Sequence, residues 1–176
     1  MKIFLLSILF SVFVLSSCAT QSPKVYFAPP GDTIENVIVR EIDAAQSQIL
    51  VEAYGFTSDK IVEALIRAQN RHVNNDTIDV EALLDRSNET AVYSKWKLLR
   101  KAHIPIRIDD EGHIAHNKIM IIDRKIVITG SFNFTENAKH NEENVLVISD
   151  HDLAMKYIDN WNTREGFSRP PKKIRK

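Results

Sequence analysis

Strand-like and helix-like segments alternate along the chain from Val25 to Trp161, and this alternation limits the possible folds more than any other feature of the sequence. Short runs of β-branched residues predict strands, whereas apolar residues repeated every three or four positions predict amphipathic helices. A chain that alternates the two buries both by packing helices against a sheet. The sequence therefore predicts one α/β domain over residues 24–167, a sandwich of a mixed β-sheet flanked by helices.

The expected elements follow from these patterns and from capping residues. Strands are expected at residues 25–28, 48–54, 77–84, 104–108, 114–122, 125–129 and 143–148, with a loop over 130–141. Helices are expected after Asp32 in a capping box with Glu35, after Ser58, over 88–102 with Val92, Trp96 and Leu99 inward, and after Asp150.

The N-terminal residues 1–17 have the pattern of a signal peptide. Lys2 is followed by an almost uninterrupted apolar run over residues 3–15. That run is shorter than the roughly 20 residues that cross a bilayer, so a permanent membrane helix is the weaker alternative.

The cleavage site has two interpretations. Leu15-Ser16-Ser17-Cys18 resembles the cleavage box of bacterial lipoproteins, in which the cysteine becomes the lipidated first residue. Cys18 is the one cysteine of the chain and forms no internal disulfide, which favours lipidation and membrane association. Plain secretory cleavage near Ala19 is the alternative. Either way the protein is expected to be exported, as a periplasmic or outer-membrane lipoprotein or in secreted form.

Charge does not identify a partner. Lys plus Arg and Asp plus Glu each number 23, so no strong overall field favours nucleic acid or a membrane surface. The basic residues 168–176 form a tail that we expect to be disordered.

The chemistry is concentrated in the segment IAHNKIMIIDRKIVITGSFNF, which begins at Ile114. In a strand, side chains two residues apart share a face, so His116 and Lys118 are expected to project together. Asp123 lies at an odd offset from His116, which places it on the opposite face or in the following turn. We therefore interpret Asp123 as structural.

The spacing of this segment carries a resemblance to a known family. The pattern HxK(x)4D(x)6GSxN is met without a gap by His116, Lys118, Asp123, Gly130, Ser131 and Asn133. On the order of a few per million chains of this length match it by chance. The pattern is the signature of the phospholipase D superfamily, and YGFTS, LLDRSN and NEENV elsewhere in the chain resemble its short, single-motif members. That subgroup contains secreted endonucleases, bacterial phospholipase D-like proteins and mitochondrial relatives.

The resemblance implies a phosphodiesterase that acts through a phosphohistidine. His116 is the expected nucleophile, and Lys118 and Asn133 are expected to stabilise charge on the phosphoryl oxygens. Ser131 is expected to hydrogen-bond the phosphate or the catalytic network. A carboxylate is expected to orient the imidazole, and Glu143 is the candidate, with Glu142 as the alternative.

No cofactor and no metal are expected. His113 and His116 are three residues apart, but no carboxylate spacing beside them matches a metal site that we recognise. Gly130 is assigned a structural part in the motif.

The reaction needs a histidine nucleophile and a general acid, yet the chain has one copy of the motif. The economical solution is a two-fold homodimer that brings two copies of His116 to one phosphate.

Three functions remain open, and the first of them is preferred. An endonuclease on DNA or RNA is favoured by the short single-motif length and the basic tail. A phospholipase D that releases lipid headgroups is favoured by the expected lipid anchor. A non-enzymatic module that binds phosphate or nucleic acid is disfavoured by the intact motif.

Overall fold

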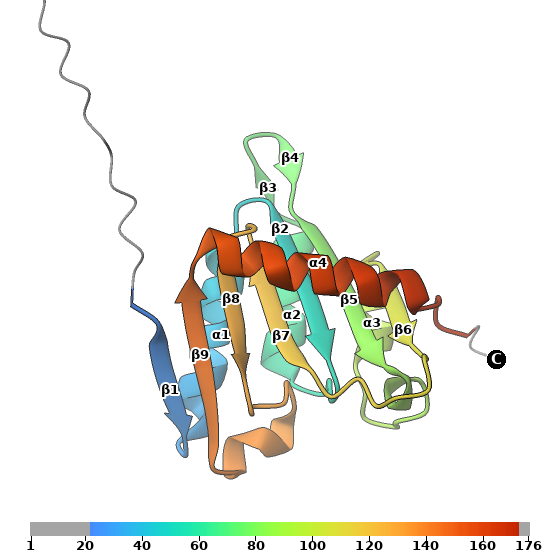
Figure 1. The fold of residues 1–176 in the computed structure, drawn as a ribbon, viewed down its shortest axis with the longest axis horizontal. Helices are drawn as coiled ribbons and strands as arrows, with labels where there is room; N and C mark the ends of the chain where they lie inside the picture. Colours follow the sequence, from blue (N-terminus) through green and yellow to red (C-terminus); the bar gives the residue numbers. More distant parts are fainter. Residues whose placement is uncertain (1–21, 173–176) are drawn as a thin grey trace, which may run out of the picture.

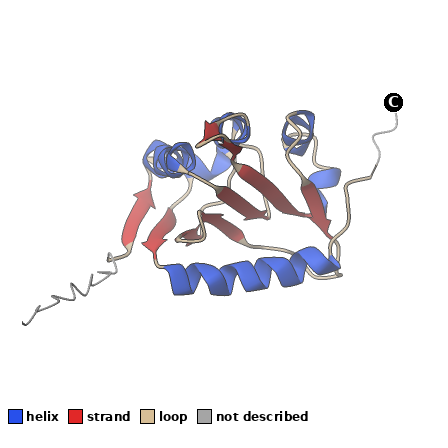
Figure 2. Ribbon diagram, turned by 90° about the horizontal axis from the view of Figure 1, so that it is seen from above, coloured by secondary structure: helices blue, strands red, loops and turns tan. Residues whose placement is uncertain are grey.

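The computed structural model describes residues 22–172 and contains a seven-stranded mixed sheet with helices on both faces (Figure 1, Figure 2). The sheet consists of β1 (Lys24–Ala28), β2 (Gln48–Ala53), β5 (Asp79–Asp85), β6 (Ile106–Asp109), β7 (Lys118–Ile122), β8 (Ile126–Gly130) and β9 (Glu143–Ser149). The strands β3 (His72–Val73) and β4 (Asp76–Thr77) form a separate hairpin. The helices are α1 (Gly31–Ala44), α2 (Asp59–Gln69), α3 (Trp96–Lys101) and α4 (His151–Phe167), with the short 3₁₀ helices η1 (Arg86–Glu89) and η2 (Glu136–His140). This is the predicted fold class.

The strand order is β1-β9-β8-β7-β2-β5-β6. Strands β2, β5 and β6 run parallel, whereas β7 is antiparallel to β2, and β8, β9 and β1 alternate in direction beyond it. The carboxyl ends of β2, β5 and β8 therefore meet the amino ends of β7 and β9 along one border of the sheet, at the bottom of Figure 1. We call this border the site edge.

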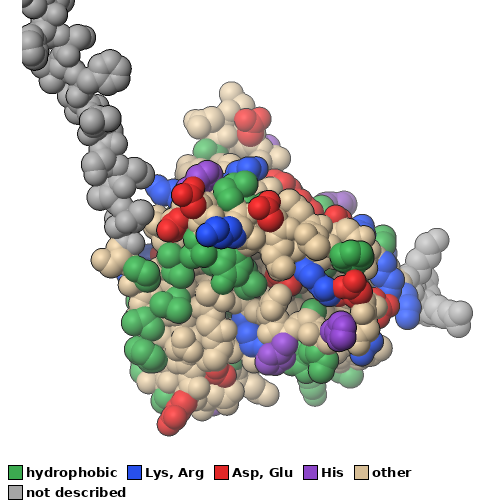
Figure 3. Space-filling model, in the orientation of Figure 1, with side chains coloured by type: hydrophobic (Ala, Val, Ile, Leu, Met, Phe, Trp, Pro, Cys, Tyr) green, Lys and Arg blue, Asp and Glu red, His purple; other side chains and the backbone are tan. Residues whose placement is uncertain are grey.

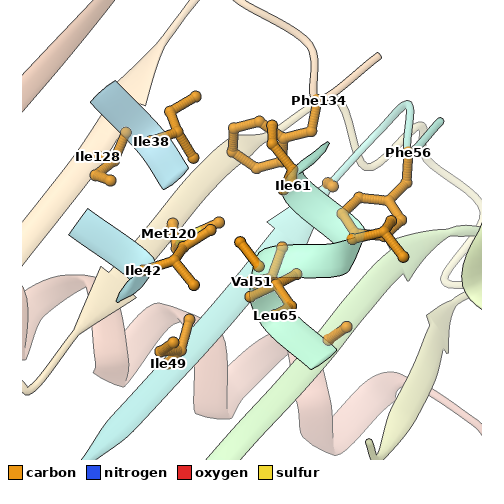
Figure 4. Packing of buried hydrophobic residues seen from close by; sticks show 14 of the residues in the cluster. Ile38, Ile42, Ile49, Val51, Phe56, Ile61, Leu65, Met120, Ile128 and Phe134 are labelled. Atoms are coloured by element: carbon orange, nitrogen blue, oxygen red, sulfur yellow. The ribbon is translucent and has the colours of Figure 1, made fainter. Parts of the chain in front are cut away.

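Two hydrophobic cores hold the layers together. Helices α1, α2 and α3 cover one face, and α4 alone crosses the other (Figure 2). The larger core lies on the three-helix face and includes Ile38, Ile42, Val51, Leu65 and Met120 (Figure 4). The smaller core lies under α4 and joins Leu50, Leu83, Ile119, Ile121 and Val127 to Ala154, Ile158 and Trp161.

The helix starts agree with the sequence at two of three places. Ser58 and Asp150 each accept a hydrogen bond from a backbone N–H of the first turn, as predicted. The predicted capping box of Asp32 and Glu35 is wrong, because α1 has Pro30 as its N-cap. Glu35 instead faces the core, accepts a hydrogen bond of 2.6 Å from the Ser58 hydroxyl, and pairs with Lys139 at 3.2 Å.

The predicted helix over residues 88–102 is also wrong, since only η1 and the short α3 form there. The buried side chain of Asn88 donates to the carbonyl oxygens of Tyr54 and Asp85 and accepts from Ser94. Such side-chain bonds compete with helical backbone bonds. Trp96 and Leu99 are buried as predicted, but Val92 is 88% exposed.

The predicted disordered tail is wrong for residues 168–172. Arg169 exchanges two backbone hydrogen bonds with Ile108, of 2.7 and 3.0 Å, and its guanidinium pairs with Glu89 and Asp110 at 2.8 Å each. Residues 173–176 lie outside the described part of the chain, as do the predicted signal peptide and Cys18. Within residues 22–172, every helix is too short or too polar to span a bilayer.

Candidate active site

His116 and Lys118 meet at the site edge, although not by the strand geometry that the sequence predicts. Strand β7 begins only at Lys118, so His116 lies in the preceding loop and its side chain is exposed. The Lys118 side chain turns back, placing Nζ 3.0 Å from His116 Nδ1 and 2.7 Å from the His116 carbonyl oxygen. The loop remains irregular because its backbone bonds to groups outside a strand ladder: Ala115 N–H donates to Asp85 at 2.9 Å. The predicted pairing of the two side chains is confirmed, and its predicted cause is wrong.

Tyr54 packs against both side chains. Its ring centroid lies 4.6 Å from that of the His116 imidazole at an interplanar angle of 53°, and Lys118 Nζ lies 5.3 Å from the Tyr54 ring centroid. Burial lowers the pKa of Lys118, and the nearby charge of Glu143 opposes that shift. A partly desolvated ammonium interacts more strongly with an anion than one in water.

Ser131 and Glu143 form a second group beside the first. The Ser131 hydroxyl donates to Glu143 Oε2 and accepts from the Asn144 N–H at 3.0 Å. Asn141 donates to the other carboxylate oxygen at 3.1 Å. The sequence predicted that Glu143 orients the imidazole. Within residues 22–172, its carboxylate instead bonds to Ser131 and Asn141. The alternative residue, Glu142, is exposed.

Gly130 and Asn133 lie on either side of Ser131. A Cβ atom at Gly130 would lie 2.2 Å from the Asn144 carbonyl oxygen, so only glycine allows β8 and β9 to approach here. Asn133 lies between two buried phenylalanines, Phe132 and Phe134, which fix its backbone. Its Oδ1 atom is buried and without a hydrogen-bond partner among the described residues. An amide oxygen only accepts hydrogen bonds, so the donor role expected of Asn133 falls to its Nδ2 atom.

Asp123 lies away from this group, in the turn at the opposite end of β7, where strand parity places it. Its carboxylate accepts hydrogen bonds from the backbone N–H groups of Gln46, Ser47 and Gln48 and from the Ser47 hydroxyl, at 2.7 to 3.1 Å. Its backbone is left-handed, with φ 53°. Asp123 therefore fixes the connection between α1 and β2.

The surroundings of His116 are open. A cleft of about 440 Å³, which we call the side cleft, is lined by Tyr54, Ile114, Arg86 and Lys172 among others. Three exposed apolar residues on two loops are called the apolar rim. Ile114 lines the side cleft, Tyr93 lines a hollow with Thr135, and Val92 precedes Tyr93; they are 64, 80 and 88% exposed. In Figure 3, histidine and Lys or Arg side chains lie side by side on the lower half of the face, beneath α4.

Sequence reasoning missed the residues that hold the motif in place. Asp85 lies in the segment LLDRSN, which carried the resemblance, but was given no role, and Tyr54 in YGFTS was expected only to pack. Asn117 and the buried Glu52, which bond to each other, carried no recognisable signal beyond an acidic residue in an apolar strand. No group of three or more metal-ligating side chains is present within residues 22–172.

Comparison with protein families and curated sequences gives the following matches. The family model described as "Cardiolipin synthase, PLD-like domain" matches residues 38–164, from α1 to α4. The chain is 43% identical over 157 residues to a phospholipase D of Rickettsia prowazekii (strain Madrid E), covering 89% of this chain and 74% of that protein. It is 28% identical over 134 residues to a human mitochondrial cardiolipin hydrolase, covering 76% of this chain and 51% of that one.

Solved structures show the same architecture. Nuc from Salmonella typhimurium, described as a phospholipase D family member, superposes with a TM-score of 0.77 at 33% identity, covering 86% of this chain and 99% of Nuc. NucT from Helicobacter pylori superposes with a TM-score of 0.75 at 21% identity, covering 85% and 98%, and shows likeness of fold.

Proposed function

The chain belongs to the phospholipase D superfamily, and from this premise we propose that its substrate is the headgroup phosphodiester of a membrane phospholipid. The enzyme class itself is plain: the protein is a phosphodiesterase, a hydrolase of ester bonds. The sequence alone favours nucleic acid as substrate. The observation that favours lipid instead is the exposed apolar rim, whose Ile114 lies two residues before the exposed His116, because exposed apolar side chains near a polar site suit docking on a lipid surface.

The proposed reaction is a double displacement at phosphorus. The imidazole Nε2 of His116 attacks in line, a P–N bond forms, and the bond to the departing headgroup oxygen breaks as a second histidine supplies its proton. That histidine then takes a proton from water, which attacks phosphorus, breaks the P–N bond and leaves phosphatidic acid. Lys118 and Asn133 stabilise the charge on the non-bridging oxygens.

The contact between Lys118 and His116 determines the tautomer of the imidazole before substrate binds. A charged ammonium only donates hydrogen bonds, so His116 Nδ1 is the acceptor and the proton of a neutral ring is on Nε2. Attack requires the other tautomer. We propose that an incoming phosphate accepts the Lys118 hydrogen bond, that the ring proton moves from Nε2 to Nδ1 by exchange with water, and that the protonated Nδ1 turns toward Glu143, whose charge already acts on Lys118.

The second histidine is proposed to come from a second copy of the chain. On the α4 side of the sheet, Val25 and Phe27 of β1 are 48 and 65% exposed, and Leu146 of β9 is half-buried beside them. Hydrophobic side chains lie uncovered over this part of the sheet at the left of Figure 3. Phe27 and Glu143 line the same hollow, so a copy packed on this patch lies directly beside the site.

Nucleic acid is the second candidate substrate. Arg86 and Lys172 both line the side cleft, next to the Tyr54 ring that contacts His116. Lys172 also begins the basic end of the chain, since residues 172–176 read KKIRK. Cations at this position suit the neighbouring phosphates of a polynucleotide.

Export remains part of the proposal. Lipidation of Cys18 holds the enzyme at a membrane and so raises its concentration at a phospholipid substrate. The proposed location is the periplasm or the outer membrane, or the medium if cleavage occurs near Ala19.

One experiment separates the candidates. The purified mature protein is incubated with phosphatidylcholine vesicles, with phosphatidylglycerol vesicles and with supercoiled plasmid, and His116→Asn serves as the inactive control. We expect headgroup release and no nicking. Plasmid nicking without headgroup release would reject the lipid substrate in favour of the endonuclease, and turnover of neither would favour a module that only binds phosphate.

Two variant sets sharpen the result. Replacing Val92, Tyr93 and Ile114 by Ser is expected to slow hydrolysis of vesicles but not of a dissolved short-chain phospholipid, because only vesicles need docking. The matched set, Arg86→Ala with Lys172→Ala, is expected to leave both lipid activities unchanged. If instead the first set has normal vesicle hydrolysis and Arg86→Ala with Lys172→Ala loses plasmid nicking, the side cleft would be assigned to nucleic acid.

A further inference from the structure

Three buried carboxylates lie together on the α4 side of the sheet at the site edge. Glu52, Asp85 and Asp109, on the adjacent strands β2, β5 and β6, are 2, 3 and 0% exposed. A buried carboxylate is costly unless charge or hydrogen bonds compensate it. Asp109 pairs with Arg164 of α4 at 2.6 Å, and Asp85 accepts the Ser87 and Ala115 N–H groups at 2.9 Å each. Both have evident structural partners.

Glu52 differs from the other two. Its Cα partners in the neighbouring strands are the apolar residues Leu83 and Ile119 of the smaller core, and Asp109 and Arg164 are near enough to act on its charge. Its side-chain hydrogen bond is donated by Asn117 Nδ2 to Oε1. Burial raises the pKa of Glu52, and the bond from Asn117 opposes that shift. The strand would pack at lower cost with a leucine here, so the acid serves something other than packing.

Asn117 is the residue between His116 and Lys118, and it is held at two points. Its side chain bonds to Glu52, and its carbonyl oxygen accepts the Tyr54 N–H at 2.9 Å. The exposed His116 ring is otherwise contacted by Lys118 Nζ and by the Tyr54 ring. The direction in which the imidazole leaves the loop therefore depends on the rotation of the Asn117 peptide units, which Glu52 fixes.

We propose that Glu52 is a positioning residue, which acts through Asn117 to hold the side chains of His116 and Lys118 in the orientation that brings them together. This inference rests on the proposed phosphodiester chemistry at His116. The proposal explains why an acid is retained in an apolar strand, since displacement of a reacting group by about 1 Å is enough to lower a rate about 100-fold.

The test uses the dimeric, full mature chain with Glu52→Leu, Asn117→Ala and the double variant. We expect kcat to fall 10- to 100-fold in each, KM to stay within about twofold, and the double variant to be no slower than the slower single variant. Thermal unfolding of Glu52→Leu is expected at or above the wild-type temperature, because an apolar side chain replaces a desolvated charge. Glu52→Gln is expected to restore most of the rate, since its amide oxygen still accepts from Asn117.

Glu81→Leu is the matched control. Glu81 lies on the same side of the sheet, beside Leu50, and burial raises its pKa as well, but it is remote from the motif loop. Its kcat is expected to equal that of the wild type. Equal losses in Glu81→Leu and Glu52→Leu, or additive losses in the double variant, would overturn the positioning role, as would a wild-type kcat for Glu52→Leu.

A second measurement separates this inference from the proposed function. The ring ¹⁵N resonances of His116 report its tautomer without any turnover. We expect one tautomer in the wild type and in Glu81→Leu, and a mixture in Glu52→Leu and Asn117→Ala. Unchanged resonances in those variants would reject the positioning role. An inactive wild type with these expected resonances would reject only the proposed function.

Discussion

The Nζ atom of Lys118 lies 3.0 Å from the Nδ1 atom of His116, and the lysine is only 7% exposed. The ammonium thus contacts the imidazole, and in the proposed mechanism it also donates to the substrate phosphate. Because both contacts require hydrogen-bond donation, the proposed site works only while Lys118 is protonated.

The alkaline limit of activity follows from that requirement. Burial lowers the pKa of Lys118 below its ordinary value of 10.5, so the charged form is lost at a lower pH than for a surface lysine. The rate is therefore expected to fall with rising pH at a midpoint below that value. Lys118→Arg keeps its charge at every accessible pH, and its pH–rate profile should lack this fall, although its kcat is lower because a guanidinium fork replaces a point charge. An alkaline limb common to both proteins would exclude Lys118 as its source.

Removal of the charge is a separate test. Lys118→Ala is expected to lower kcat about 10²- to 10³-fold, as for loss of one preorganised donor to a developing charge. Its circular dichroism spectrum and oligomeric mass should match the wild type, since Lys118 is the first residue of β7 and its side-chain hydrogen bonds within residues 22–172 are to His116. A loss below tenfold would show that another group stabilises the phosphoryl oxygens.

Replacement of Asp123 should lower the stability of the fold without changing the rate of catalysis. Asp123→Ala removes the carboxylate that accepts hydrogen bonds from four donors at the turn remote from His116. The free energy of unfolding is expected to fall by about 2 kcal/mol. The kcat per folded enzyme is expected to stay the same. Asp76→Ala, in the exposed β3–β4 hairpin, is the control for loss of one acidic side chain. A fall in kcat for Asp123→Ala without any loss of stability would contradict the structural assignment.

Chelation should not affect the rate. Lys118 and Asn133 are proposed to supply the electrostatic stabilisation that a divalent cation supplies in metal-dependent phosphodiesterases. The measurement is headgroup release with and without EDTA. Complete loss that one specific metal restores would reject this account.

The N-terminus of the exported protein tests the anchor. Mass spectrometry of protein recovered from membranes is expected to find a lipid-modified Cys18 as the first residue. An unmodified start near Thr20, or retention of residues 1–17, would reject the lipoprotein form.

Some features of the site were predictable because they depend on short-range spacing. The motif positions define which residues gather, and the length of β7 between them places Asp123 in the turn at the far end of the strand from His116. The start of β7 was not predictable, because bonds from Ala115 and Asn117 to distant carboxylates keep the preceding residues out of the strand.

The remaining errors have similar long-range causes. Asn88 interrupts the predicted helix through bonds to β2 and β5, and Arg169 orders the tail through Glu89 and Asp110. Partners so far apart in the chain leave no periodic signal in the sequence. The fold class was predictable because the alternation of apolar patterns spans the whole domain.

The composite site is the central claim, and subunit exchange tests it most directly. Wild type and His116→Asn are mixed at varied ratios, allowed to exchange, and assayed for headgroup release. A dimer with one His116 lacks either the nucleophile or the acid, so activity should fall with the square of the wild-type fraction, to about one quarter at equal amounts. A linear fall, to about one half, would show that each chain works alone and would contradict the shared site.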